Sequence, residues 1–274
     1  MRIRIDYSTT YAYDRAARFI LQALRLTPRS SETQQVRHWN IETDVDARLR
    51  RSEDAFGNIV HHLYTEQPTR GLTVRVTGEV TTVDNAGVVP RDQEVLSPLV
   101  FLRDTPLTRA DRLIAVFASE FSGHPPLERL HRLTSAIHGS VRFEIGATTT
   151  AHTAAEVLAL GRGVCQDHAH LFIACARHMK LPARYVSGHL LRRDQADQSA
   201  AHAWAEAWIE GLGWVGFDPA NGVCPTDRYI RVATGLDYLG AAPVRGASYG
   251  GAGERMTVNV SVRDADMQQS QRQS

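Results

Sequence analysis

The segment AHAWAEAWIEGLGWVGFDP, residues 201–219, places the strongest constraint on how this 274-residue chain folds. Over residues 201–209, alanines alternate with large or polar residues, a pattern that predicts a β-strand with two unlike faces. The alanine face can approach a wide neighbour closely, so we expect it to pack against a buried helix. We expect a cleft beside the opposite face, where Glu206 is interpreted as a solvated or supporting carboxylate. That face carries His202, Trp204, Glu206 and Trp208.

A hairpin brings an acidic residue close to His202. Residues 210–213 have the composition of a turn, and a second strand, 213–217, ends directly before Asp218. Asp218 should therefore lie within a rung or two of His202, although the sequence leaves the register open. From there its carboxylate can accept a hydrogen bond from one imidazole nitrogen and leave the other nitrogen for a reacting group. Asn221 is interpreted as a turn residue.

The stretch GRGVCQDHAH, residues 161–170, supplies a candidate nucleophile. Its glycines interrupt the preceding helix, and an amphipathic helix is predicted to start near Cys165 and to run to about Lys180. The N-terminus of a helix has unpaired N–H groups and a partial positive charge, which stabilise a thiolate and can also bind an oxyanion. We interpret Cys165 as the nucleophile, His202 as its base and Asp218 as the group that orients the base.

The rest of the chain predicts an α+β protein in two parts. Residues 1–90 alternate in short segments and indicate an N-terminal β-sandwich, with only 16–26 ambiguous between a short helix and a bulged strand. Residues 91–107 are predicted to connect the sandwich to a core at 108–263, and the polar tail 264–274 is predicted to be disordered. Within the core we expect helices over 109–121, 127–138 and 154–160, and strands over 183–191 and 256–262.

Composition argues against several classes of protein. Lysine and arginine total 31 against 30 acidic residues, and no basic block suggests a nucleic-acid partner. No stretch approaches the ~18 apolar residues of a membrane span, and the first residues lack the apolar segment of a signal peptide. Three cysteines do not suit a disulfide framework. We therefore expect a cytoplasmic protein with reduced thiols and no membrane association, and we leave the oligomeric state open.

A zinc site is the main alternative role for the cysteines. Cys165 and His168, like Cys175 and His178, have the C-x-x-H spacing of zinc ligands. Both pairs fall in one predicted helix, with the second pair over two turns from the first, so they cannot converge on one ion. We therefore expect neither a metal nor a cofactor, and interpret Cys175 and Cys224 as packed thiols.

The motifs GRGVCQDHAHL and AHAWAEAWIEGLGWVGFDPANG together resemble the bacterial branch of the transglutaminase-like superfamily of cysteine enzymes. LRLTPR at 24–29 and DAFGN at 54–58 are similar to the β-rich region that precedes the core in that branch. The resemblance implies a papain-like core, made of a helix bundle and an antiparallel sheet, against which the β-sandwich packs. It also implies an acyl-enzyme mechanism with Cys165, His202 and Asp218 as the catalytic triad.

This resemblance implies a peptide or protein substrate with an amide or isopeptide bond, and leaves the acyl acceptor open. Water as acceptor would make the protein a cysteine protease, peptidase or amidase, which we favour, and an amine would make it a protein-glutamine transglutaminase. A non-catalytic binding module of the same fold is a further alternative, although such a module does not require all three residues. Enzymes of this superfamily often place an aromatic donor upstream of the cysteine. This chain has Ile145 there, so the second oxyanion donor is unassigned.

Overall fold

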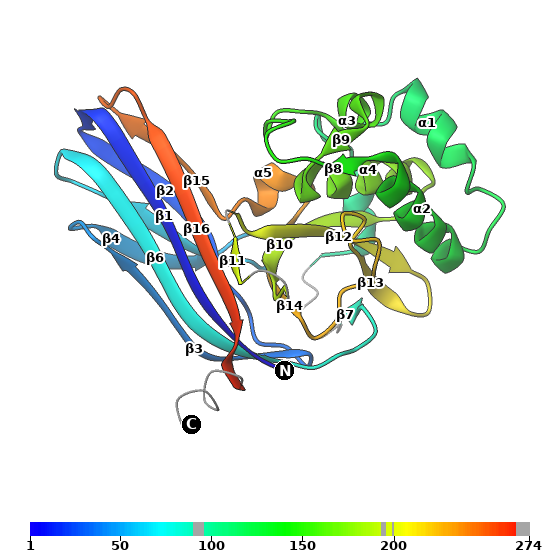
Figure 1. The fold of residues 1–274 in the computed structure, drawn as a ribbon, viewed down its shortest axis with the longest axis horizontal. Helices are drawn as coiled ribbons and strands as arrows, with labels where there is room; N and C mark the ends of the chain where they lie inside the picture. The colour runs from blue at the N-terminus through cyan, green and yellow to red at the C-terminus, as the bar shows by residue number, and fades with distance from the viewer. Residues whose placement is uncertain (90–95, 193–195, 199, 267–274) are drawn as a thin grey trace.

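The structure is a computed structural model that describes residues 1–89, 96–192, 196–198 and 200–266. Long strands form one part of the molecule, and helices over a second, shorter sheet form the other (Figure 1). The β-rich α+β class predicted from the sequence is therefore confirmed. None of the helices in the described ranges is long and apolar enough to cross a membrane.

Two antiparallel sheets make up the β-rich part, with strand orders β11–β16–β1–β6–β3 and β15–β2–β5–β4. The first sheet consists of β11 (Asp197–Gln198), β16 (Arg255–Asp264), β1 (Arg2–Ala17), β6 (Thr69–Thr82) and β3 (Gln34–Thr43). The second consists of β15 (Val244–Tyr249), β2 (Phe19–Thr27), β5 (Ile59–Tyr64) and β4 (Arg48–Glu53).

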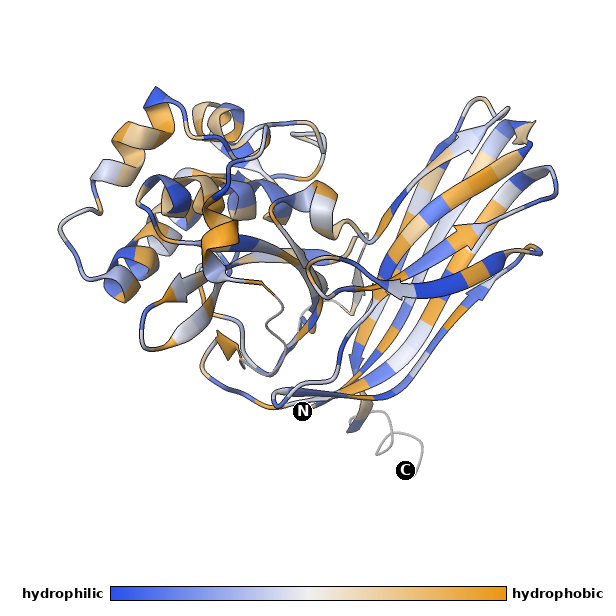
Figure 2. Ribbon diagram, turned by 180° about the vertical axis from the view of Figure 1, so that it is seen from behind, coloured by the Kyte–Doolittle hydropathy of each residue, from blue (hydrophilic) through white to orange (hydrophobic). Residues whose placement is uncertain are grey.

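Period-two alternation is the reason that these segments form strands. Ile3 and Val76 from the first sheet and Leu24 and Leu63 from the second are buried in one apolar cluster. Hydrophobic and hydrophilic residues accordingly alternate along the long strands (Figure 2). The ambiguous segment 16–26 is strand: β1 ends at Ala17, and β2 starts two residues later.

The last two long strands return to the β-rich part. β16 pairs with β1, and β15 pairs with β2, so both complete sheets that the first 82 residues begin. The sequence interpretation placed these strands inside a core at 108–263. The physical reason for the difference is burial: Val260 and Val262 of β16 join the apolar cluster of the two sheets. The part of the tail at 267–274 lies outside the described residues.

The other part is an antiparallel sheet covered by helices, in the strand order β14–β10–β12–β13–β7. Its strands are β14 (Tyr229–Gly235), β10 (Ala183–Leu190), β12 (His202–Ile209), β13 (Gly213–Phe217) and β7 (Val88–Val89). Its helices are α1 (Arg112–Ser119), α2 (Pro126–Ser140), α3 (Ala154–Leu160), α4 (Cys165–His178) and α5 (Tyr238–Ala241). A short parallel pair, β8 (Arg142–Phe143) with β9 (Arg162–Gly163), precedes α4.

The predicted connection packs onto this sheet. β7, which lies just before the connection in the segment predicted as sandwich, pairs with β13, and the connection itself contains a 3-10 helix at Pro98–Leu102. Phe101 of that helix is buried with its ring 5.1 Å from the ring of Trp214. Residues 90–95 of the connection lie outside the described residues.

Helix α4 is buried along its length, from Gln166 to Arg177. The alanine face of β12 packs on it, as the sequence predicts, and α1, α2 and α3 cover its other sides. Ala203, Ala205, Ala207, Ala169 and Phe172 lie in the resulting apolar cluster. Because an alanine side chain is a single methyl group, the strand and the helix come close together, which brings the start of α4 near the start of β12.

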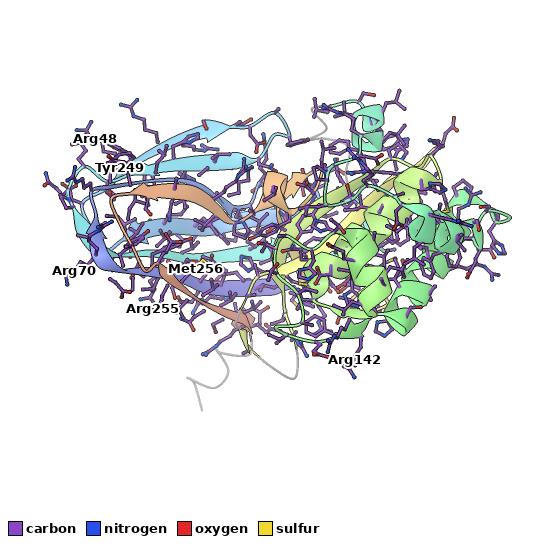
Figure 3. The ribbon with its side chains drawn as sticks, turned by 90° about the horizontal axis from the view of Figure 1, so that it is seen from above. Arg48, Arg70, Arg142, Tyr249, Arg255 and Met256 are labelled. Atoms are coloured by element: carbon purple, nitrogen blue, oxygen red, sulfur yellow. The ribbon has the colours of Figure 1, made fainter. Side chains whose placement is uncertain are left out.

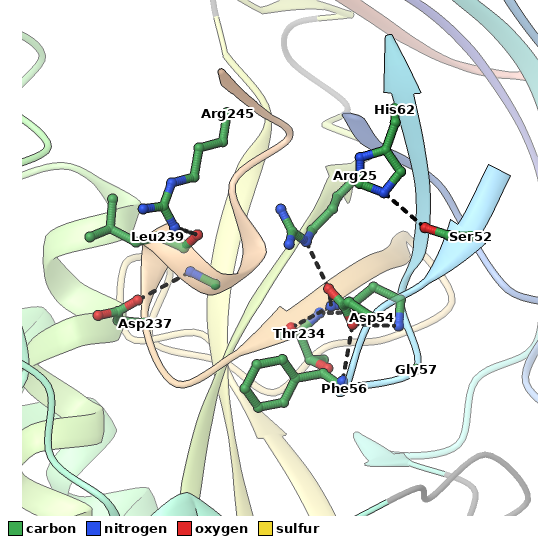
Figure 4. A network of polar contacts seen from close by, with 12 residues as sticks. Arg25, Ser52, Asp54, Phe56, Gly57, His62, Thr234, Asp237, Leu239 and Arg245 are labelled. Carbon is green, nitrogen blue, oxygen red and sulfur yellow. Dashed lines mark hydrogen bonds and ion pairs between the residues drawn. The ribbon is translucent and has the colours of Figure 1, made fainter. Parts of the chain in front are cut away.

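Two side-chain amides tie the β-rich part to strand β14. Gln34 accepts from Arg231 N–H at 3.0 Å and donates to the Arg231 carbonyl at 2.8 Å. Asn58 does the same at Thr234, with distances of 2.8 Å and 2.7 Å. Asp54 holds Asn58 in place, as part of the polar network in Figure 4, by accepting from its side-chain amide at 3.0 Å. The DAFGN motif is thus a joint between the two parts.

We expect Ala205→Leu to destabilise the protein by about 1–3 kcal/mol, because extra methyl groups overpack the contact between α4 and β12. Urea unfolding at neutral pH measures the loss. Ala247→Leu on strand β15 is the matched control, since Ala247 is exposed and the same change there should alter stability by only about 0.5 kcal/mol. Equal losses in the two variants would contradict close packing at β12.

Candidate active site

Cys165 is the first residue of helix α4, directly after the extended residue Val164. Asp167 fixes this helix start, because its carboxylate accepts from Val164 N–H at 2.8 Å and from the Thr148 hydroxyl at 2.6 Å. Gly163 allows the close approach, since a Cβ at that position would lie 2.6 Å from Asp167 Oδ2. The turn leaves the half-buried Cys165 thiol facing a cleft of about 620 Å³.

His202 is the first residue of β12, and its Nε2 lies 2.6 Å from Asp218 Oδ2. Strands β12 and β13 pair Ala205 with Phe217, so Asp218 lies one residue beyond the last rung, diagonal to His202. Nε2 is directed at Asp218, and Cys165 is near enough to His202 to help raise the pKa of the imidazole. Cys165 and His202 line the same cleft. The structure thus brings the three residues singled out in the sequence together.

Asp218 is fully buried and accepts several hydrogen bonds. Its Oδ1 accepts from the backbone N–H groups of Ala220 and Asn221, at 3.1 and 3.2 Å. Its Oδ2 accepts from the Asn221 side-chain amide at 2.7 Å and from the Tyr229 hydroxyl at 2.8 Å, in addition to His202. A buried carboxylate with this many donors is held ionised and in one orientation.

The electrostatics of the pair favour charge on both partners. Burial strongly lowers the pKa of His202, but the charge of Asp218, the hydrogen bond that His202 donates to Asp218 and the neighbouring Cys165 outweigh burial and raise that pKa to about 10. Burial raises the pKa of Asp218, and the charge of His202 with the hydrogen-bond donors reverses this, leaving the pKa below its ordinary value. Near neutral pH the pair is an imidazolium and a carboxylate, and an imidazolium stabilises a neighbouring thiolate.

Tyr229 and Trp204 belong to the site, although sequence reasoning gave Tyr229 no role. Tyr229 lies at the start of β14, which pairs with β10 and not with β13, so only the sheet order brings its hydroxyl to Asp218. The Trp204 ring stacks beside the His202 ring at 6.2 Å and contacts the Tyr229 ring edge-on at 5.4 Å. Gly188, opposite His202, leaves room for that indole, because a Cβ there would lie 2.6 Å from the Trp204 ring.

The structure excludes the solvated alternative for Glu206 and keeps the interpretation of Asn221. Glu206 is fully buried, not solvated, and forms ion pairs with Arg184 at 2.6 Å and Arg231 at 2.8 Å. Glu206 lines a separate pocket of about 100 Å³ together with Arg29 and Phe56, whereas the cleft at Cys165 lies at the His202 end of the strand. Asn221 is a turn residue, as interpreted, and also donates to Asp218.

The remaining cysteine and histidine side chains do not form a ligand set within the described ranges, where no three His, Cys, Asp or Glu side chains cluster as metal ligands do. His168 is buried, and its ring nitrogens lie 2.8 and 2.9 Å from the carbonyls of Val164 and Val141. Burial raises the pKa of the Cys175 and Cys224 thiols.

Ile145 does not replace an aromatic oxyanion donor. Its apolar side chain is 75% exposed at the cleft, where it can supply contact but no hydrogen bond. The N–H groups of Cys165 and Gln166 at the start of α4 remain as donors near the sulfur, because the first N–H groups of a helix have no partner within it; Asp167 N–H donates to the Val164 carbonyl.

Two matches to known families agree with this arrangement. Residues 3–81 match the bacterial transglutaminase-like N-terminal region, and residues 116–219 match the transglutaminase-like superfamily core. The chain belongs to the transglutaminase-like superfamily. The matched core contains Cys165, His202 and Asp218, and the N-terminal match contains the Asp54–Asn58 network that ties the β-rich part to β14.

Similar proteins extend over nearly the whole chain. An uncharacterized protein from Mycobacterium leprae is 32% identical over 271 residues, which cover 92% of this chain and 94% of the relative. An uncharacterized protein from Mycobacterium tuberculosis is 31% identical over 289 residues, covering 95% and 91%. A crystal structure described as "a Putative Cysteine Protease from Cytophaga hutchinsonii" superposes with a TM-score of 0.79 at 22% identity, covering 97% and 91%. The fold is therefore shared across both parts.

We expect Asp218→Asn to lower the pKa of His202 from about 10 by about 2 or more, because burial then acts without the opposing charge. Nitrogen-15 NMR titration of labelled histidine measures the pKa of His202 in both proteins. Buried His170, whose pKa is about 4, is the internal control. A raised histidine pKa stabilises the fold below pH 6.5 and loses its effect as the pH rises through about 10. The difference in the free energy of unfolding between wild type and Asp218→Asn should therefore shrink as the pH rises from 6.5 to about 10. An unchanged His202 titration would refute the pairing.

Tyr229→Phe removes one hydrogen bond to the buried carboxylate and should cost about 1.5–3 kcal/mol of stability. Urea unfolding measures the loss. The matched control is Tyr249→Phe, since Tyr249 is 58% exposed on β15 and the same deletion of a hydroxyl there should be nearly neutral. A Tyr229 variant as stable as this control would mean that the hydroxyl does not support Asp218.

Proposed function

We propose that the protein is a thiol-dependent acyl-transfer enzyme that cleaves amide or isopeptide bonds, with Cys165 as nucleophile, His202 as acid and base, and Asp218 as the residue that orients the imidazole. The observation that carries the proposal is the 2.6 Å contact between His202 and the buried Asp218, made in the cleft that Cys165 also faces. Membership of the transglutaminase-like superfamily supports a thiol enzyme.

In this proposal the Cys165 thiolate attacks the carbonyl carbon of the substrate, and N–H groups at the start of α4 stabilise the oxyanion. His202 donates its proton to the leaving amine as the C–N bond breaks, which leaves a thioester on Cys165. A water molecule then gives a proton to His202 and attacks the thioester, and the carboxylic acid product leaves as the thiolate re-forms. Asp218 keeps Nε2 occupied throughout, so that the other ring nitrogen exchanges the proton.

Water is the acceptor that the cleft favours over an amine. An amine acceptor such as lysine approaches as a cation, and a carboxylate near the sulfur would attract it. None of the described residues that line the cleft is an aspartate or glutamate, and Arg192 is among them. The charge of the lining therefore supports a protease, peptidase or amidase, with the protein-glutamine transglutaminase as the alternative.

We also interpret the two long sheets as a β-sandwich that supplies one wall of the catalytic cleft, since Tyr7, Thr9, Met256 and Val258 all line it. We propose a cytoplasmic location for the enzyme, which would keep the Cys165 thiol reduced; the three cysteines of the chain are free.

Iodoacetamide should alkylate Cys165 first at pH 6–7, with Cys175 and Cys224 slower because burial raises the pKa of both thiols. His202→Ala should slow labelling of Cys165 by about tenfold or more at this pH, since the imidazolium that stabilises the thiolate is gone. Mass spectrometry assigns the labelled cysteine. His178→Ala at the exposed end of the same helix is the control and should label like wild type.

Turnover separates an enzyme from a binding module. Cys165→Ala should lower amide hydrolysis by about 10³-fold or more in a screen of unfolded protein and peptide substrates. The same screen with a fluorescent primary amine tests incorporation into product. Hydrolysis without incorporation supports a hydrolase, and incorporation supports the transglutaminase alternative. Slow, uniform labelling of the three cysteines together with no turnover would reject a thiol enzyme.

A further inference from the structure

We infer that the acyl donor of this enzyme carries uncharged, apolar side chains next to the scissile carbonyl. The inference rests on the proposed function, because it concerns the substrate that Cys165 would attack. It comes from the walls of the cleft around Cys165 and His202, which the two parts of the molecule supply together.

The cleft is bounded on two sides by apolar residues from distant segments. Phe143, the last residue of β8, and Ile145 lie on the side of the helical part. Met256 and Val258 come from β16, which pairs with β1 in the β-rich part. Figure 3 shows Met256 on that strand. At about 620 Å³ the cleft falls within the size range of pockets that enclose small ligands.

Three of these apolar side chains are open to solvent in the free protein. Ile145 is 75% exposed, Met256 58% and Phe143 49%. Large apolar side chains gathered at one place on a surface mark a site for a partner or ligand, because contact removes them from water. Their position beside the nucleophile makes the substrate the partner that covers them. A flexible methionine on one wall can adapt to apolar groups of different shape.

The charge of the lining supports the same substrate class. Apart from His202, Arg192 is the charged residue among the described residues that line the cleft, and none of them is acidic. A lysine or arginine of the substrate would lose hydration against apolar walls and would find no carboxylate among these residues. An aspartate or glutamate would likewise lose hydration against Phe143 and Ile145. Uncharged apolar side chains avoid both costs.

Chloromethyl ketones test the inference, because they bind like an acyl donor before the thiolate displaces chloride and forms a thioether. We would compare the N-acetyl-phenylalanyl, N-acetyl-aspartyl and N-acetyl-lysyl compounds for their rate of labelling Cys165. Each rate is divided by the iodoacetamide rate of the same protein, since iodoacetamide carries no side chain. The phenylalanyl compound should react about 10- to 100-fold faster than either charged compound on this scale.

A pair of variants locates the preference in the cleft. Met256→Glu should reduce the normalised advantage of the phenylalanyl compound over the lysyl compound by about 5- to 10-fold, because the acidic side chain hydrates the β16 wall and attracts the cation. Val116→Glu is the matched control: Val116 is 57% exposed on α1, does not line the cleft, and should leave the ratio as in wild type.

The outcomes separate this inference from the proposed function. Equal normalised rates for the three ketones, or faster labelling by a charged one, overturn the inference, while selective iodoacetamide labelling of Cys165 leaves the thiol enzyme standing. An aspartyl preference would point to Arg192 as the determinant. Failure of iodoacetamide to select Cys165 removes the proposed function, and the inference falls with it.

Discussion

Close contact between helix α4 and the alanine face of strand β12 is the constraint on which the rest of the site depends. Cys165 starts the helix and His202 starts the strand, so the separation of helix and strand determines whether sulfur and imidazole meet. Methyl groups at Ala203, Ala205 and Ala207 keep that separation small. His202, Trp204 and Glu206 lie on the opposite face of β12, where His202 lines the cleft and Glu206 forms buried ion pairs.

Support for the imidazole extends well beyond Asp218. The carboxylate is held by Tyr229 on β14, and β14 is in turn held by the amides of Gln34 and Asn58. The β-rich part is therefore joined to the His202–Asp218 pair through strand β14. The N-terminal region thus contacts the site in two ways, through the cleft wall and through the bonds that Asn58 of the DAFGN motif makes to β14.

The sequence predicted the local elements better than their assembly. Periodicity located α3 and β13 to the residue, and the order of Cys165, His202 and Asp218 was enough to single out the site. The role of Tyr229 could not be predicted, because it depends on which strand lies beside β10. The partner strand of β16 could not be predicted either. The alternation of its residues indicates a strand but does not specify which strand it pairs with. Its partner β1 lies at the other end of the sequence, so the pairing leaves no local signal.

Pairing of β1 with β16 also sets the order in which the protein can be completed. Ile3 of β1 pairs with Asp264 of β16, close to the end of the described residues. One edge of β1 therefore stays without a partner strand until β16 has been synthesised. Contacts between such distant segments form slowly, because a long loop must close before they contribute. During synthesis the Cys165 helix can form while Met256 and Val258 are still absent. Helix α4 with Cys165 is thus made before the β16 wall of the cleft, and a nascent chain does not have a finished cleft until β16 has been added.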